Sequence, residues 1–212
     1  ESFDESGDQL QAFYPSGKIS SGDIQQLAAQ IPFSVDFTEE EMPDINWNEE
    51  WEKNYFQPLL IDNKVLIRAP FHQEYPLADY EIVIEPNMAF GTGNHETTSM
   101  MIEHLLNFDL TDKTVLDMGC GTGILGIFAS MLGAQSITAI DIDEWAYQGT
   151  MENAALNHIS NLRASQGDAS LLGEETYDLI LANIQKNIIL QDIEKYTKVL
   201  REEGILVLSG FY

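Results

Sequence analysis

Cysteine, basic residues and long apolar runs are all scarce in this sequence. The single cysteine, Cys120, has no intramolecular partner for a disulfide, which is compatible with a reducing compartment. The longest mostly apolar segment, 124–134, is far shorter than a bilayer span, and the amino terminus is acidic where a secretory signal is basic. We therefore expect a soluble, cytoplasmic, globular protein with one sizeable core and a smaller appended unit.

The shortage of basic residues makes the chain strongly acidic. Its 10 lysines and arginines stand against 35 aspartates and glutamates, which gives a net charge of −25. A field of this sign repels nucleic acid and anionic lipid and favours encounter with a basic partner. Simple solubility or a salt-adapted host explains the same charge. Under either interpretation we expect no direct contact with nucleic acid or membrane.

Side chains with metal-ligand spacing are missing as well. The four histidines share no spacing with aspartate, glutamate or cysteine that is typical of a metal site. We therefore predict no metal. Only His95 lies in a candidate ligand loop, where it either structures the loop or contacts a ligand.

What the sequence does contain, from residue 113 onward, is a regular alternation of strand-like and helix-like segments. The apolar patterns predict strands at 113–118, 136–140, 162–167, 177–182 and 204–209, and helices near 123–132, 144–157 and 187–200. This order is typical of an α/β fold with a parallel sheet and helices on both faces. In such a fold the ligand-facing loops lie at the carboxyl ends of the strands.

The part before residue 113 is divided into three. We predict a partial small α/β domain over 1–43, an aromatic linker helix over 44–58, and the start of the main domain, 59–212. The small domain is expected to contain a strand at 10–14, a helix at 22–31 and a strand at 33–37. In the main domain a hairpin over 59–67, a strand at 80–85 and a helix at 95–106 precede the alternating region. The linker carries Trp47, Trp51 and Tyr55 on one helical face, a spacing typical of packing.

Three alternating glycines follow the strand predicted at 113–118. We call residues 115–123 the glycine turn; it contains Asp117, Gly119, Gly121 and Gly123. Glycine lets a ligand approach the backbone closely, and the start of the next helix offers free N–H groups. The glycines alone fit two cofactors, S-adenosylmethionine or a nicotinamide dinucleotide.

The position of the acid favours S-adenosylmethionine. In dinucleotide-binding folds the first glycine of the fingerprint follows the strand closely, whereas here Asp117 and three further residues precede Gly121. An acid at the strand end also suits a cofactor with a cationic amine better than a pyrophosphate. A nicotinamide-dependent oxidoreductase is the rival hypothesis.

Acidic residues follow the next two predicted strands. Asp141 can accept hydrogen bonds from ribose hydroxyls, with Ile142 beside it, whereas Asp143 suits the N-cap of the following helix. Asp168 follows the strand at 162–167, where an adenine amino group would lie. These residues indicate a nucleoside without choosing the cofactor.

Asn183 ends the strand predicted at 177–182. Its amide oxygen can accept a hydrogen bond from an attacking amine and orient the nitrogen lone pair. The alternative is that Asn183 caps the helix beginning near Lys186.

Four motifs then occur in order along the chain. They are Glu-Pro-Asn-Met-Ala-Phe-Gly-Thr-Gly-Asn-His-Glu-Thr-Thr at 85–98, Val-Leu-Asp-Met-Gly-Cys-Gly-Thr-Gly at 115–123, Asp-Ile-Asp at 141–143 and Ala-Asn-Ile at 182–184. Their combination resembles the bacterial ribosomal protein L11 methyltransferases. The first motif is the specific one, because many methyltransferase families share the glycine turn.

The resemblance implies a Rossmann-like class I methyltransferase fold and an amino-terminal domain that recognises the substrate. It implies methylation of lysine side chains and of the α-amino group of a large-subunit ribosomal protein. Cofactor-binding positions of the family coincide with Thr98, Gly119, Asp141 and Asn183. The likeness also implies that the sequence begins within the recognition domain and ends before the final antiparallel hairpin of the fold.

Our hypothesis is an S-adenosylmethionine-dependent protein N-methyltransferase, monomeric, that acts on a basic ribosomal protein. The candidate catalytic residues are Asn183 and Thr98. The candidate cofactor-binding residues are Phe90, Thr98, Asp117, Gly119, Gly121, Gly123, Asp141, Ile142, Asp168 and Asn183. No residue is an evident general base. The alternatives are a methyltransferase of another protein or of a small amine, and a cofactor-binding interaction module without catalysis.

Overall fold

The computed structural model describes residues 57–85 and 96–210, the backbone of 2–6 and 9–13, and the single residues 22, 24, 26, 30 and 38. By its contacts the chain divides into two compact units, Glu1–Trp47 and Asn48–Tyr212. The domain boundaries expected from the sequence stay predictions.

The first unit contains an antiparallel pair of strands, β1 (Ser2–Ser6) and β2 (Gln9–Phe13). Strand β2 agrees with the strand predicted at 10–14, whereas β1 was not predicted. Residues 22, 24 and 26 are helical, within the helix expected at 22–31. The strand predicted at 33–37 and the aromatic linker helix with Trp47, Trp51 and Tyr55 lie outside the described residues.

The second unit is built on a five-stranded sheet in which every neighbouring pair is parallel. Its strand order is β10-β9-β6-β7-β8. The strands are β6 (Thr114–Met118), β7 (Ser136–Asp141), β8 (Leu162–Gln166), β9 (Tyr177–Asn183) and β10 (Leu200–Ser209). All five strands were predicted, but β10 starts earlier than expected, with a shift in register between Leu200 and Ile205.

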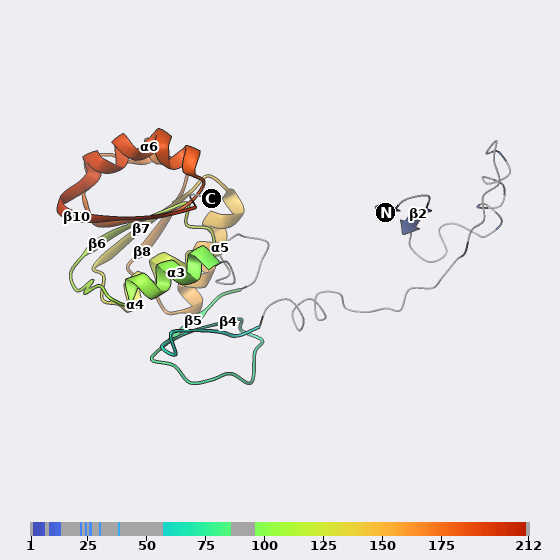
Figure 1. The fold of residues 1–212 in the computed structure, drawn as a ribbon, viewed down its shortest axis with the longest axis horizontal. Helices are drawn as coiled ribbons and strands as arrows, with labels where there is room; N and C mark the ends of the chain where they lie inside the picture. The colour runs from blue at the N-terminus through green and yellow to red at the C-terminus, as the bar shows by residue number, and fades with distance from the viewer. Residues whose placement is uncertain are drawn as a thin grey trace. The chain divides into compact units, whose positions relative to one another are not determined.

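Alternating side chains on the central strand β6 divide the core into two layers. Val115 joins one apolar cluster, whereas Leu116 and Met118 join the other. The helices α3 (Glu96–Leu105), α4 (Ile124–Met131) and α5 (Glu144–Leu156) contribute to the first cluster. The second cluster contains residues of α6 (Lys186–Val199) and the 3-10 helix η1 (Ala169–Leu171). Helices thus cover both faces of the sheet, as predicted (Figure 1).

A second, three-stranded sheet adds to the first core layer. It is formed by β3 (Leu59–Ile61), β4 (Val65–Arg68) and β5 (Tyr80–Val83), in that order. The predicted hairpin joins β3 to β4 through residues 62–64. Asp62 and Asn63 both have positive φ (49° and 52°), and the turn is closed by a hydrogen bond from Lys64 N to the carbonyl oxygen of Ile61 at 3.0 Å. Strand β5 runs parallel to β4 and occupies an edge of this sheet.

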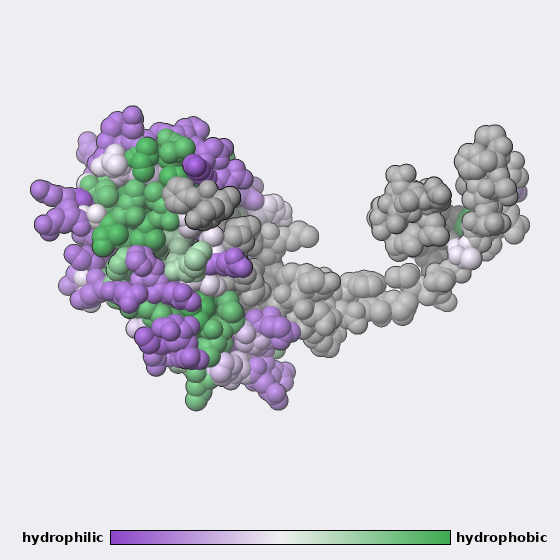
Figure 2. All heavy atoms as spheres, viewed as in Figure 1, coloured by the Kyte–Doolittle hydropathy of each residue, from purple (hydrophilic) through white to green (hydrophobic). Residues whose placement is uncertain are grey.

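The surface of the second unit is mixed rather than uniformly charged. Figure 2 shows apolar residues gathered near α6 and β10 within hydrophilic surroundings. Leu190 of α6 is 62% exposed and Ile205 of β10 is 45% exposed. In the part of the chain that the structure describes, no helix has the length and apolar character needed to cross a membrane.

Candidate active site

The glycine turn connects β6 to α4 at the carboxyl edge of the sheet. Gly119, Gly121 and Gly123 all have positive φ, at 70°, 56° and 77°. A Cβ on Gly119 would lie only 2.2 Å from Cγ2 of Ile184. Because both the backbone conformation and this close approach exclude a side chain, position 119 requires glycine.

Asp141 links the glycine turn to the end of β7. Its Oδ2 accepts a hydrogen bond from Gly121 N at 2.8 Å, and its Oδ1 accepts one from Asp143 N at 3.0 Å. Each carboxylate oxygen keeps a further lone pair, so the carboxylate can still accept hydroxyl donors. The neighbouring Ile142 is 75% exposed, an apolar side chain in water that a planar ring can cover. The pair has the chemistry to hold a nucleoside.

The two other acids at this edge act as helix caps. Asp143 caps α5 by accepting a hydrogen bond from Trp145 N at 2.9 Å, the role that the sequence favoured for it. Asp168 caps η1 by accepting one from Ser170 N at 2.7 Å. Hydrogen bonds from the side chain and the backbone N–H of Ser170 hold the pKa of Asp168 below its usual value. This exposed carboxylate is therefore ionised at neutral pH.

Asp117 differs from these acids because it is buried, with 1% of its surface exposed. Its Oδ2 accepts a hydrogen bond from Gly126 N, in the first turn of α4, at 2.9 Å. Burial raises the pKa of Asp117 to about 7; the Gly126 hydrogen bond opposes this rise and the charge of Asp141 adds to it. The structure therefore gives Asp117 a partner within the fold, on the helix that follows the glycine turn.

Asn183 connects three elements at the same edge. Its Nδ2 donates to Thr98 Oγ1 on α3 at 3.1 Å, and its Oδ1 accepts a hydrogen bond from the Ser209 hydroxyl on β10. The N-cap of α6 is Gln185, so Asn183 is not the cap that the alternative interpretation required. Its Oδ1 keeps one lone pair for a further donor, such as an amine.

Ser209 was missed by the sequence analysis. It lies opposite Asn183 in the parallel register of β10 and β9. The available signal was its place at the end of the strand predicted at 204–209, because polar residues that end neighbouring parallel strands meet at one edge.

Two residues of the candidate ligand loop, Phe90 and His95, fall within 86–95, outside the described residues. The predicted cofactor-binding role of Phe90 stays a prediction, and both roles that the sequence allows for His95 stay open. Among the residues that are described, no group of three or more histidines, cysteines, aspartates or glutamates could hold a metal ion.

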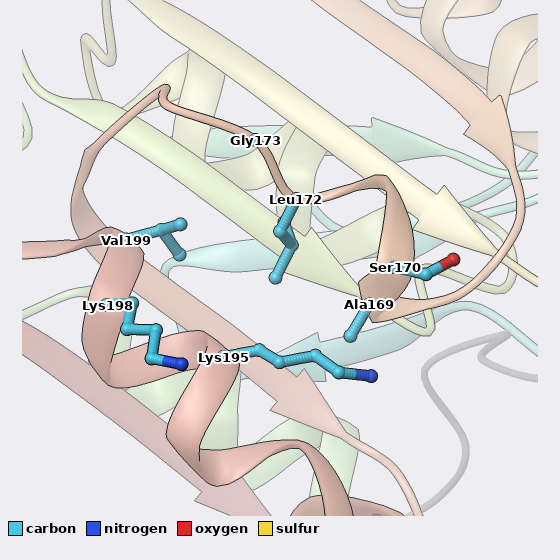
Figure 3. A pocket seen from close by; sticks show the side chains of 7 residues that line it. All are labelled: Ala169, Ser170, Leu172, Gly173, Lys195, Lys198 and Val199. Atoms are coloured by element: carbon cyan, nitrogen blue, oxygen red, sulfur yellow. The ribbon is translucent and has the colours of Figure 1, made fainter.

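A cavity of about 290 Å³ lies between η1 and α6. Lys195 and Lys198 extend from α6 beside it, and Ala169 and Ser170 border it from η1 (Figure 3). Lys195 is paired with Asp192 at 2.7 Å. None of the predicted cofactor residues that the structure describes lines this cavity.

Comparison with known proteins identifies the family. A family model described as ribosomal protein L11 methyltransferase (PrmA) matches residues 2–212. The chain belongs to this family. The L11 methyltransferase of Porphyromonas gingivalis is 51% identical over 216 residues, covering 100% of this chain and 74% of that protein. That of Thermoanaerobacter sp. is 36% identical over 222 residues, covering 98% of this chain and 71% of that protein.

A solved L11 methylase supports the fold of this family member. The crystal structure from Lactobacillus delbrueckii subsp. bulgaricus matches with a TM-score of 0.68 and 31% identity, over 73% of this chain and 80% of that chain. The parallel sheet and this likeness together confirm the predicted Rossmann-like class I methyltransferase fold. The family expected from the sequence motifs is confirmed as well.

Proposed function

We propose that this protein is an S-adenosylmethionine-dependent protein N-methyltransferase that modifies lysine side chains and the α-amino group of ribosomal protein L11. The names of its relatives support the substrate. The observation that carries the proposal is the anchored amide of Asn183, which keeps a free lone pair on Oδ1 at the edge that also holds Asp141. An amine needs such an acceptor to be oriented for attack.

The residues at the carboxyl edge fit S-adenosylmethionine. The carboxylate of Asp141 is already fixed by two backbone N–H groups and would accept the ribose hydroxyls. Ile142 would cover the adenine and Asp168 would accept from its amino group, with the glycine turn beside them. We assign Phe90, Thr98, Gly119, Gly121, Gly123 and Asp117 to the same site, Asp117 through its hold on α4. When bound, the cofactor supplies an electrophilic methyl group on a cationic sulfur.

Asn183 and Thr98 would act on the substrate side. Thr98 holds the Asn183 amide, whose Oδ1 would accept an N–H of the amine and point the nitrogen lone pair at the methyl carbon. The nitrogen would then form the new C–N bond while the C–S bonding pair leaves with sulfur. A lysine must be neutral to attack, so desolvation in the closed site or proton loss to water has to precede the step.

The charge of the chain supports a basic protein as the partner. With a net charge of −25, the enzyme would attract a lysine-rich ribosomal protein and accelerate their encounter. We also propose that residues 1–43 recognise the substrate, that 44–58 link them to the catalytic part at 59–212, and that the reaction takes place in the cytoplasm, where bacterial ribosomes assemble.

The test is transfer of a labelled methyl group from S-adenosylmethionine to purified L11. We expect label in L11 with the parent protein and about 100-fold slower transfer with Asn183→Ala. The control is Asn107→Ala, which should keep the parent rate. Asn107 follows the carboxyl end of α3, whereas Thr98 lies near the amino end of this helix. If L11 receives no label although calorimetry still shows that the protein binds S-adenosylhomocysteine, the result would favour a binding module without catalysis.

A further inference from the structure

Helix α5 carries two fully buried polar side chains that face the glycine turn. Thr150 is 0% exposed and donates from its hydroxyl to the carbonyl oxygen of Gly121 at 3.0 Å. Asn153, one turn further on, is 1% exposed and donates from Nδ2 to the carbonyl oxygen of Thr122 at 2.9 Å. The glycine turn is thus held from behind by side chains of a helix that follows it in sequence.

Asn153 makes a second hydrogen bond in another direction. Its Oδ1 accepts from the backbone N–H of Glu85 at 2.9 Å, just beyond the end of β5. Asn157, the C-cap residue that follows α5, accepts from Val83 N at 2.8 Å and donates to Val83 O at 2.7 Å. The backbone groups of Val83 and Glu85 therefore find hydrogen-bond partners on the side chains of Asn157 and Asn153.

Of the two asparagines, Asn153 contacts both the glycine turn and the residues that follow β5, whereas Asn157 contacts β5. A planar amide offers a donor and an acceptor at a fixed separation, and a carboxylate or an apolar side chain of the same size lacks the donor. Its two partners belong to different motifs: Thr122 lies in the glycine turn, and Glu85 is the first residue of the 85–98 motif that leads to Thr98. One buried amide thus sets the distance between the turn and the strand end before that motif.

We propose that Asn153 is a positioning residue for cofactor binding, which fixes the glycine turn against the end of β5. This inference rests on the proposed function, because it assumes that the glycine turn binds S-adenosylmethionine. The amide touches neither cofactor nor substrate; it acts through the carbonyl of Thr122 and the N–H of Glu85. Without the hydrogen bonds of this amide the glycine turn still forms, but it is less ordered before the cofactor binds. Ordering it on binding costs free energy and weakens the affinity.

The test compares Asn153→Asp with Asn157→Asp on the full chain. Both changes keep the acceptor and replace the donor by a carboxylate oxygen facing a backbone carbonyl, but only the first faces the glycine turn. We expect the Kd and KM for S-adenosylmethionine to rise about tenfold in Asn153→Asp, the equivalent of one lost hydrogen bond, with kcat within about twofold of the parent at saturation. Asn157→Asp should lower Tm and leave the Kd unchanged.

Asn153→Ala and Asn157→Ala repeat the comparison without a buried charge, in case the aspartate variant does not fold. A Kd equal to that of the parent in a folded Asn153 variant would overturn the inference, since a purely structural amide changes Tm alone. A parent protein that binds no S-adenosylmethionine would instead overturn the proposed function, so the two failures are distinguishable in one titration series.

Discussion

At the scale of single residues, individual hydroxyl and carboxyl groups fix the orientation of polar atoms in the site. The Ser209 hydroxyl donates to Asn183 Oδ1 while Thr98 accepts from Nδ2, so the amide has its oxygen and nitrogen placed from both sides. Without the serine, the Asn183 side chain loses the contact that fixes its oxygen toward β10.

We therefore expect Ser209→Ala to lower kcat about tenfold, with little change in the KM for S-adenosylmethionine, because the amine loses orientation and the cofactor contacts remain. Ser209→Thr keeps the hydroxyl and should retain most of the activity. Steady-state kinetics with L11 as substrate measures both. A parent-like kcat in Ser209→Ala would show that Thr98 suffices to orient Asn183.

The buried carboxyl of Asp117 makes a prediction about pH. Its pKa is about 7 in the folded chain against 3.8 for an ordinary aspartate, so between these values the folded state holds a proton that the unfolded state has lost. Its contribution to stability is therefore complete below pH 4 and is lost as the pH rises through 7.

Asp117→Asn keeps an acceptor for Gly126 N and removes the titration. Relative to this variant, the free energy of unfolding of the parent should fall by about 3 kcal/mol between pH 5 and pH 8. Urea unfolding at the two pH values measures the difference, and parallel pH dependence of the two proteins would contradict it.

At the scale of elements, the two ends of the parallel strands have different roles: contacts at the amino end stabilise the sheet, and the proposed cofactor residues lie at the carboxyl end. At the amino end, the Asp178 carboxylate of β9 accepts hydrogen bonds from Thr114 N on β6 at 2.8 Å and from Arg201 Nη1 on β10 at 2.6 Å. Although burial alone would raise it, the hydrogen bonds from Thr114 and the charge of Arg201 hold the pKa of Asp178 below its usual value. One carboxylate thus ties three neighbouring strands together.

Asp178→Ala should lower the free energy of unfolding by about 2 kcal/mol, since it leaves the Thr114 N–H without its acceptor. The Kd for S-adenosylmethionine should not change, because the cofactor residues lie at the opposite end of the strands. The exposed Glu194 on α6 provides the control: its alanine variant should stay within about 0.5 kcal/mol of the parent. An equal loss in both variants would contradict a special role for Asp178.

At the scale of the whole molecule, the charge of −25 has two interpretations that kinetics can separate. If the field steers a basic substrate, the association rate with L11 should fall at least about tenfold between 50 mM and 500 mM NaCl, with a smaller change in the dissociation rate. Surface plasmon resonance over a salt series measures both rates. An association rate that is independent of salt would leave solubility or a salt-adapted host as the explanation.

Most of the secondary structure was predictable because it depends on local patterns. Apolar periodicity located all five strands of the main sheet, and the capping role of Asp143 followed from its place before a helix. The early start of β10 was not predictable, since residues 200–204 (Leu-Arg-Glu-Glu-Gly) have no strand pattern. Leu200 pairs with Tyr177 of β9, and the register then shifts before Ile205 pairs with Leu179. Ser209 and Asn153 escaped notice because their partners lie in distant segments.

By itself the sequence determined the α/β order, the family and the polar residues that end each strand, because periodicity and motifs are properties of neighbouring residues. Only the tertiary structure decided how these residues are used. It buries Asp117 against Gly126, sets Ile184 against Gly119, and holds Asn183 between Thr98 and Ser209. Burial and hydrogen bonding between distant segments arise from packing, and the order of residues along the chain does not contain them explicitly.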